Sequence, residues 1–357
     1  MSKKAIIAMS GGVDSSVAAY LMKEQGFDCT GITMKLFDNE DIGISSEKTC
    51  CSFEDVEDAR SVASSLGIPF HVFNFSDDFN EQVIDRFIEA YEKGETPNPC
   101  IDCNRYMKFE KLMTRAKQLG VDYVVTGHYA RIEYDEQHGR YLLKKGVDEA
   151  KDQSYALYTM TQDQLSHTLF PLGGLKKDEI REIAMSKGFI NAKKRDSQDI
   201  CFVRDGDYAG FIKQHTGKVY EAGNFIDSDG NVLGRHNGLI RYTIGQRKGI
   251  GLSFEKPMYV GDKNIESNTV TLCDNDGLLS NVLNATDFNW ISCDKPEQPV
   301  RVKAKIRYNQ KEQWATAKQT PSGLVSVEFD EPQRAIAKGQ AVVLYDGDII
   351  VGGGTIV

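Results

Sequence analysis

The first 130 residues alternate between short apolar runs and amphipathic segments, and this alternation limits the possible folds more than any other feature. Four apolar runs have the length and composition of strands: 3–9, 28–34, 69–75 and 122–127. Four segments between them carry apolar residues at helical spacing: 13–26, 53–67, 78–92 and 105–119. Apolar strands separated by helices form a parallel sheet covered on both faces. We therefore predict an α/β fold, a doubly wound parallel sheet.

The rest of the chain changes in character. Residues 152–190 have the pattern of two helical segments separated by 170–177. From about residue 206 glycine becomes frequent and short β-rich runs stand between turn signals, and from about 282 such runs follow closely, as in a small barrel. We expect three domains in the 357 residues: an α/β domain with helical additions over 1–205, a small β-rich middle domain over 206–280, and a C-terminal β-barrel over 281–357.

Composition and the chain start indicate a cytosolic protein without a membrane partner. The first residues contain too few apolar side chains for a secretory signal, and no apolar run approaches the ~18 residues of a membrane span. Reducing conditions then make a structural disulfide framework unexpected. We assume a monomer when free. The net charge of −9 argues weakly against a polyanionic partner, but the local field decides docking.

A glycine turn joins the first strand to the first helix in IIAMSGGVDSSVAAYL. Gly11 and Gly12 allow the backbone to approach an anion, and the following helix presents unpaired N–H groups to it. Ser10, Ser15 and Ser16 add hydroxyl donors. The spacing is neither that of a Walker A loop nor G-x-G-x-x-G. The turn is predicted to bind phosphate.

Two of the eight cysteines, Cys100 and Cys103, form a C-x-x-C in TPNPCIDCNRYMKF. No second C-x-x-C or His pair completes a four-ligand zinc site. Half of a metal site, a disulfide, a redox switch and a nucleophile all remain open on these residues alone. A thioredoxin-like redox pair is disfavoured because the helix is expected to begin at 105 and not at the cysteines.

Basic residues alternate with apolar ones at the start of the C-terminal domain. Arg301, Lys303, Lys305 and Arg307 are interleaved with Val302, Ala304, Ile306 and Tyr308. On a strand, this period places all four positive charges on one face. Either that face is solvated, or a phosphate backbone covers it and relieves the repulsion.

Beyond this, SGGVDSS resembles the pyrophosphate-loop motif of the N-type ATP pyrophosphatases, the PP-loop superfamily. Further blocks resemble, in order, the tRNA-specific 2-thiouridylases, and together they run from residue 5 to the C-terminus: CCSFEDVEDARSVASSLGIPF, TPNPCIDCNRYMKF, VTGHYAR, KKGVDEAKDQSYALY, KKRDSQDICFV, YTIGQRKGIG and KAKIRYN. The resemblance implies an enzyme that adenylates the wobble uridine of tRNA with ATP and replaces the C2 oxygen by sulfur, releasing AMP and pyrophosphate.

The resemblance also implies residue roles. It places ATP beside Ala8, Met9, Ser10, Gly11, Gly12, Val13, Asp14, Ser15, Met34 and Gly127, with Asp14 holding Mg²⁺. It places the target base at Asn98, Pro99 and Cys100, and other tRNA contacts at His128, Lys151, Asp152, Gln153, Arg307, Tyr308 and Gln340. It makes Cys103 the nucleophile and Cys201 the persulfide carrier, loaded by a persulfide-donating sulfur carrier or a cysteine desulfurase.

The chain departs from the family pattern at Cys100, where aspartate is more usual. Cys100 with Cys103 and Cys201 would supply three thiolates to an iron–sulfur cluster, which is a second interpretation of this set. Lys193, Lys194 and Arg195 are close to Cys201 in sequence and are expected to favour its thiolate. Cys50 and Cys51 lie in a family block but have no chemical role in this scheme.

Two other functions compete with thiolation. A small-molecule ligase of the same ATP class has no use for the basic strand or for paired thiols, and would release pyrophosphate without tRNA. A non-enzymatic RNA- or metal-binding protein has no use for SGGVDS, and would not bind ATP.

Overall fold

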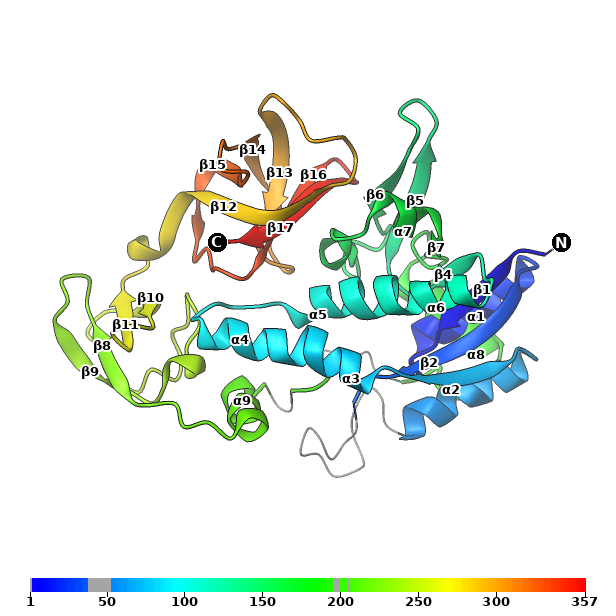
Figure 1. Cartoon of the computed structure of the whole chain (residues 1–357), viewed down its shortest axis with the longest axis horizontal. Helices are drawn as coiled ribbons and strands as arrows, with labels where there is room; N and C mark the ends of the chain where they lie inside the picture. The colour runs from blue at the N-terminus through cyan, green and yellow to red at the C-terminus, as the bar shows by residue number, and fades with distance from the viewer. Residues whose placement is uncertain (1, 38–52, 195–199, 204–205) are drawn as a thin grey trace.

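The computed structural model describes residues 2–37, 53–194, 200–203 and 206–357. Cys50, Cys51 and Arg195 lie outside these ranges. The chain forms an α/β part, a small β-rich part and a barrel, which Figure 1 shows at the right, the left and the top. No helix in the described ranges has both the length and the apolar character needed to cross a bilayer.

A five-stranded parallel sheet organises the α/β part, in the order β3-β2-β1-β4-β7. Its strands are β1 (Lys4–Ala8), β2 (Asp28–Lys35), β3 (Phe70–Asn74), β4 (Tyr123–Val125) and β7 (Thr168–Leu169). The order reverses between β1 and β4, and ligands of such sheets bind at the carboxyl edge beside this switch point.

Helices cover both faces of this sheet. One face packs through Ala5, Ile7 and Val125 against α1 (Val13–Glu24), α2 (Phe53–Ser65) and α8 (Lys177–Ser186). The other face packs through Ile6 and Val124 against α6 (Leu112–Gln118). The predicted doubly wound sheet is therefore confirmed.

Two further helices lie at the carboxyl edge of the sheet. A long helix comprises α3 (Ser76–Phe79), a π-helical segment η1 (Asn80–Asp85) and α4 (Arg86–Glu92). A second comprises α5 (Pro99–Asp102) and the π-helical η2 (Cys103–Lys111), and it continues into α6. An apolar cluster joins the two through Phe79, Phe87, Met107 and Phe202, and we call it the helical cluster.

Two expectations about these helices were wrong. The second helix begins at Pro99 and not at 105, because the Asn98 side chain accepts a hydrogen bond from the Cys100 N–H at 3.2 Å and proline suits the first helical position. The reason given against a redox pair is thus removed. Residues 152–169 are only partly helical, as the 3₁₀ turn η3 (Ser154–Leu157) and α7 (Gln162–Ser166), after which β7 pairs with β4.

The β-rich middle part begins with a helix that the sequence pattern did not predict, α9 (Tyr208–Thr216). A four-stranded sheet in the order β10-β11-β8-β9 follows. Its elements are β8 (Gly223–Ile226), β9 (Val232–His236), η4 (Leu239–Arg241), β10 (Tyr259–Asn264), β11 (Thr269–Cys273) and η5 (Asp276–Leu278). Phe225, Tyr242 and Val260 fill its core.

The C-terminal strands close into a barrel, because β12 pairs with both β15 and β17. Its strands are β12 (Leu279–Trp290), β13 (Val300–Lys305), β14 (Gln313–Gln319), β15 (Val325–Arg334), β16 (Ala341–Asp346) and β17 (Ile349–Ile356). A hairpin from the first half of the chain, β5 (Ala130–Asp135) and β6 (Arg140–Lys145), extends this sheet where Lys144 pairs with Ile349.

Candidate functional site

The predicted phosphate loop connects β1 to α1. Gly11 has φ +75°, and a Cβ there would lie 2.3 Å from the Asp55 carbonyl oxygen, so the start of α2 packs directly on the turn. The Ser15 hydroxyl donates to the Gly12 carbonyl at 3.0 Å and accepts from the Ser10 N–H at 3.2 Å. The Asn191 amide, beyond α8, donates to the Gly11 carbonyl and to Ser16 Oγ, both at 2.9 Å. The turn is therefore held in shape by contacts within the chain.

Asp14 stands in the first turn of α1 and is the acidic group of this loop. Both its carboxylate oxygens accept hydrogen bonds from Lys177 Nζ at 2.8 Å, and the Tyr129 hydroxyl donates to Oδ1 at 2.7 Å. A Cβ on Gly127 would lie 2.9 Å from the Asp14 carbonyl carbon. The loop and Gly127 thus meet at the switch point, while the expected ATP contact Met34 packs against both the helical cluster and the core under α6.

The residues present fit a magnesium ion that arrives with ATP. Within the described ranges, no group of three or more His, Cys, Asp or Glu side chains is arranged to hold a metal ion. Mg²⁺ at nucleotide sites is bound by one or two carboxylates together with substrate phosphates and water. A single carboxylate, Asp14, beside the predicted phosphate-binding turn suits that mode.

Cys103 and Cys201 both pack against the helical cluster, although almost a hundred residues separate them. Cys103 is the first residue of η2, and burial raises the pKa of its thiol while the charge of Lys108 opposes that rise. Cys100 is exposed, one turn earlier. The described residues therefore do not present these three cysteines as a cluster site.

Lys194 does not serve Cys201 as expected. Its ammonium binds Asp55 at 2.5 Å and Asp58 at 2.6 Å, both on α2. Ion pairs at direct contact distance attract strongly, so these two carboxylates hold the Lys194 ammonium on α2. Lys194 fixes the start of α2, which packs on the phosphate loop.

Four of the residues expected to contact tRNA, Asp152, Gln153, Tyr308 and Gln340, lie where the α/β part meets the barrel. The Tyr308 hydroxyl donates to the Asp152 carbonyl at 2.8 Å, and the Gln340 amide donates to the Thr96 carbonyl at 2.7 Å. Gln153 exchanges two hydrogen bonds with the Tyr129 backbone, both at 3.0 Å. Since the Tyr129 hydroxyl reaches Asp14, a continuous set of contacts runs from the phosphate loop through residues 152–153 to the barrel.

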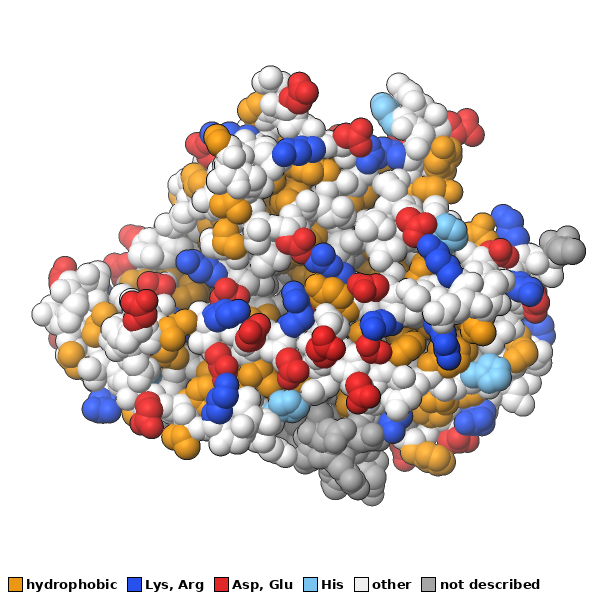
Figure 2. Space-filling view, viewed as in Figure 1, with side chains coloured by type: hydrophobic (Ala, Val, Ile, Leu, Met, Phe, Trp, Pro, Cys, Tyr) orange, Lys and Arg blue, Asp and Glu red, His pale blue; other side chains and the backbone are white. Residues whose placement is uncertain are grey.

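The basic face of β13 is shorter than expected. Arg301, Lys303 and Lys305 alternate with buried Val302 and Ala304, as predicted. Arg307 lies beyond the strand end and donates to the backbone carbonyls of residues 334 and 335. Arg301 pairs with Asp330 at 2.7 Å, which neutralises part of the face. On the face seen in Figure 2, acidic and basic side chains are interspersed, so the net charge of −9 does not make it uniformly acidic.

His128 is buried behind the carboxyl end of β4. Its Nδ1 lies 2.6 Å from Thr126 Oγ1 and its Nε2 lies 3.4 Å from Lys108 Nζ. Burial, aided by the Lys108 charge, holds the pKa of His128 well below its usual range, so the ring is neutral at pH 7. Lys108 also donates to Asn104 at 2.9 Å, which ties His128 to the helix that begins with the cysteines.

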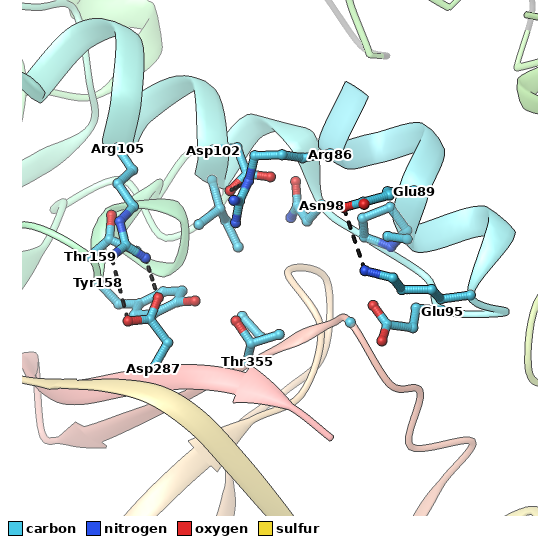
Figure 3. A pocket seen from close by; sticks show the side chains of 16 residues that line it. Arg86, Glu89, Glu95, Asn98, Asp102, Arg105, Tyr158, Thr159, Asp287 and Thr355 are labelled. Carbon is cyan, nitrogen blue, oxygen red and sulfur yellow. Dashed lines mark hydrogen bonds and ion pairs between the residues drawn. The ribbon is translucent and has the colours of Figure 1, made fainter. Parts of the chain in front are cut away.

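The helix that begins at Pro99 carries Cys100 and Cys103, and we call it the cysteine helix. A cavity of about 280 Å³ lies between this helix and the barrel. Figure 3 shows Asp102 and Arg86 facing each other on the helical side and Asp287 approaching Arg105 from β12. Asp287 has φ +47° within a bulge of β12, and this conformation aims its carboxylate out of the strand. Burial raises the pKa of Asp102 to about 6, against the opposing charges of Arg86 and Arg105.

Sequence reasoning did not find Tyr129, Lys177, Asn191 or the Arg105–Asp287 pair. Their partners lie far away in the chain, so no spacing reveals them. Lys177 alone carries a local signal, since a lysine in the first turn of a helix opposes the helix dipole.

Three family models together match almost the whole chain. Residues 3–205 match the family described as tRNA methyl transferase HUP domain, 209–274 the tRNA methyl transferase PRC-barrel domain, and 280–356 the aminomethyltransferase beta-barrel domain. Among solved structures, the chain is similar to the crystal structure of a 4-thiouridine synthetase–RNA complex with bound ATP. The match covers 60% of this chain and 50% of the synthetase chain, with 20% sequence identity and a TM-score of 0.38, and it carries no argument about function.

Curated relatives match over the full length. The tRNA-specific 2-thiouridylase MnmA of Clostridioides difficile (strain 630) is 56% identical over 356 residues, covering 100% of this chain and 98% of the relative. Its namesake in Clostridium acetobutylicum is 52% identical, covering 100% of both chains. MnmA 1 of Thermoanaerobacter sp. (strain X514) is 54% identical, covering 99% of this chain and 98% of the relative. With such identity along its entire length, the chain belongs to the tRNA-specific 2-thiouridylase family.

Proposed function

We propose that this protein is a tRNA-uridine 2-sulfurtransferase that uses ATP and a cysteine persulfide to place sulfur at C2 of the wobble uridine. The observation that best supports the proposal is that two thiols distant in the sequence pack on one helical cluster, which lies at the sheet edge that also carries the predicted phosphate loop. Cys103 and Cys201 pack on the helical cluster, and Met34 connects that cluster to the core under the sheet.

The chemistry proceeds in two displacements. The C2 oxygen of uridine attacks the α-phosphorus of ATP, and pyrophosphate leaves from the side of the phosphate loop. The terminal sulfur of the Cys201 persulfide then attacks C2, and AMP leaves with the oxygen. The Cys103 thiolate attacks Cys201 Sγ, which breaks the bond to the transferred sulfur and leaves 2-thiouridine and a Cys103–Cys201 disulfide. An external thiol reductant must reopen that disulfide before the next turnover.

Side chains of this chain have defined tasks in that scheme. The loop donors and the α1 N-terminus bind the phosphates, and Asp14 holds the magnesium ion that offsets their charge. Asn98, Pro99 and Cys100 face the target base, and residues 151–153, 307–308 and 340 position the tRNA at the junction with the barrel. A persulfide-donating protein, a sulfur carrier or a cysteine desulfurase, loads Cys201.

Substitution of each cysteine tests the proposal. Cys103→Ser and Cys201→Ser are each expected to abolish 2-thiouridine formation and to leave ATP binding unchanged, because both thiols pack on the helical cluster and serine has nearly the same size as cysteine. Cys273→Ser, in the middle part, is the matched control and should retain activity. The measurement is nucleoside mass spectrometry of tRNA after incubation with ATP and a sulfur donor. Thiolation by either of the first two variants contradicts the assigned roles, and pyrophosphate release without tRNA favours a small-molecule ligase.

A further inference from the structure

The proposed reaction gives Cys100 no chemical step, although it is the most accessible of the three thiols discussed above. Cys100 is the second residue of α5, and Cys103, at the end of that turn, donates its backbone N–H to the Cys100 carbonyl. Cys100 is exposed, whereas Cys103 and Cys201 are half-buried and pack on the helical cluster. One accessible thiol thus stands a single helical turn from a sheltered one.

The helix brings Cys100 and Cys103 within reach of a disulfide. Cys103 has helical backbone angles, φ −60° and ψ −43°, so the two residues are neighbours at i and i+3 on one face. Cα atoms at this spacing lie about 5 Å apart, inside the range of about 4.4 to 6.8 Å that a disulfide needs. Cys201, by contrast, can meet Cys103 only through tertiary packing, because the two are distant in the sequence.

Cys100 also borders the junction with the barrel. The pKa of Tyr308 is raised by burial and then by the negative charges that Asp152 and Cys100 carry when ionised, so the thiol lies near this tyrosine. Tyr308 in turn donates to the Asp152 carbonyl at 2.8 Å. Since tRNA is proposed to bind at this junction, bound tRNA covers Cys100, and the thiol is exposed again when the product leaves.

The disulfide that ends the proposed reaction is poorly placed for direct reduction. Both of its sulfur atoms belong to half-buried side chains on the helical cluster, and thiol–disulfide exchange is slow where the attacking thiol has poor access. A thiol that already lies beside Cys103 at the surface avoids this difficulty. The aspartate that is more usual in the family at position 100 cannot exchange with a disulfide, whereas cysteine can.

We propose that Cys100 is the resolving cysteine of this enzyme: its thiolate attacks Cys103 Sγ in the Cys103–Cys201 disulfide, forms a Cys100–Cys103 disulfide and expels the Cys201 thiolate. One S–S bond forms and one breaks, so the exchange consumes no oxidant or reductant, and the proton lost by Cys100 is balanced by the one that Cys201 takes up. Cys201 can then accept the next sulfur atom, while a dithiol reductant opens the exposed Cys100–Cys103 bond. The inference rests on the proposed function, which supplies the first disulfide.

Trapping the disulfide after one turnover tests the exchange. Enzyme loaded with persulfide and freed of reductant is mixed with ATP and a deficit of tRNA, then denatured with iodoacetamide and digested with trypsin without reduction. Trypsin cleaves after Lys93 and Arg105, so Cys100 and Cys103 lie in one peptide, 94–105. In the wild type and in the control Cys273→Ser, this peptide should carry an internal disulfide and Cys201 should be alkylated. In Cys100→Ser and Cys100→Asp, the peptide should instead be linked to the one that contains Cys201.

The rate of repeated turnover gives a second readout. Each protein is normalised to its own first turnover, because Cys100 is also expected to contact the target base. At limiting dithiothreitol, the normalised rate of Cys100→Ser should be about tenfold or more below that of the wild type, because the reductant must reach the sheltered disulfide directly. Saturating dithiothreitol should close most of this gap.

The outcomes separate this inference from the function on which it rests. A wild-type protein that makes 2-thiouridine but shows only the Cys103–Cys201 link, with Cys100 alkylated, overturns the resolving role and leaves the proposed function intact. Equal normalised rates for Cys100→Ser and the wild type at limiting dithiothreitol also overturn it. A wild-type protein that makes 2-thiouridine without any disulfide at Cys103 overturns the proposed sulfur chemistry and the inference together.

Discussion

At the scale of single residues, burial and a neighbouring charge have opposite effects on the pKa of the Cys103 thiol. Desolvation in the helical cluster keeps the thiol protonated at neutral pH, and the Lys108 ammonium, one turn further along η2, favours the thiolate. Lys108 also contacts His128, whose neutral ring adds no second charge. The proposed nucleophile is thus protonated at neutral pH, and the Lys108 charge assists its ionisation.

We predict that Lys108→Gln raises the pKa of Cys103 further and slows its alkylation several-fold at mildly alkaline pH. Glutamine retains a donor for Asn104 but removes the charge. Lys111→Gln, on the same segment but paired with Asp78, is the control and should leave the rate unchanged. Iodoacetamide labelling with mass spectrometry of the peptide resolves Cys103 from exposed Cys100. Equal or faster labelling of Cys103 in Lys108→Gln would show that another group controls the thiol.

Asp102 gives a pH dependence with a definite sign. Its folded pKa of about 6 lies above the ordinary aspartate value of 3.8, so the folded protein binds more protons between these values than the unfolded chain. The free energy of unfolding therefore falls as pH rises from about 4 to about 6, by on the order of 2 kcal/mol. Asp102→Asn should remove this fall, which urea denaturation of both proteins at pH 4.5 and 7.5 measures. Parallel pH profiles would contradict the assignment.

At the scale of elements, the β1–α1 turn depends on a close approach by α2. Strands and helices around it could be predicted because apolar residues such as Ile6, Ile7 and Val17 follow a regular period. The contact of Gly11 with Asp55 could not, because nothing in SGGVDSS refers to the distant segment that covers it. The two-residue strand β7 was missed for a similar reason: it is too short to show a period.

The adjacent glycines of this turn allow a matched prediction. Gly11→Ala combines a left-handed φ with a Cβ 2.3 Å from the Asp55 oxygen, and should lower the free energy of unfolding by about 2 kcal/mol or more. Gly12→Ala has φ −85° and meets only Ser10 Oγ at 3.5 Å, so it should cost less than about 1 kcal/mol. Thermal and urea unfolding compare the two. Equal losses would mean that α2 does not pack on the turn as described.

At the scale of the whole molecule, the barrel supports the helix that carries Cys103. Arg105 binds Asp287 of β12, Tyr308 reaches Asp152, and Gln340 reaches Thr96. The barrel itself was predictable from closely spaced β-rich runs. Its contacts with residues 96–105 were not, because they depend on a bulge in β12 and on side chains whose partners lie elsewhere. The arrangement of the cysteines was likewise implied only by resemblance to a family, and not by their spacing.

We predict that Asp287→Asn loosens the cysteine helix with little effect on global stability. The ion pair is more than a third exposed at Asp287 and should contribute less than about 1 kcal/mol, while asparagine tolerates the left-handed conformation. Hydrogen exchange should increase in peptides from residues 99–111 and stay unchanged in residues 4–24. Asp330→Asn, which breaks the Arg301 pair within the barrel, is the control. Unaltered exchange in 99–111 would mean that the barrel does not restrain this helix.

The pairing of β6 with β17 has a consequence for synthesis. As the chain leaves the ribosome, residues 140–145 emerge long before residues 349–356, so one edge of the β5–β6 hairpin has no strand to pair with for most of translation. Such an edge is a template for association with other nascent chains. Lys144 and Lys145, the charged end of that edge, are suited to keep it solvated until the last strand arrives.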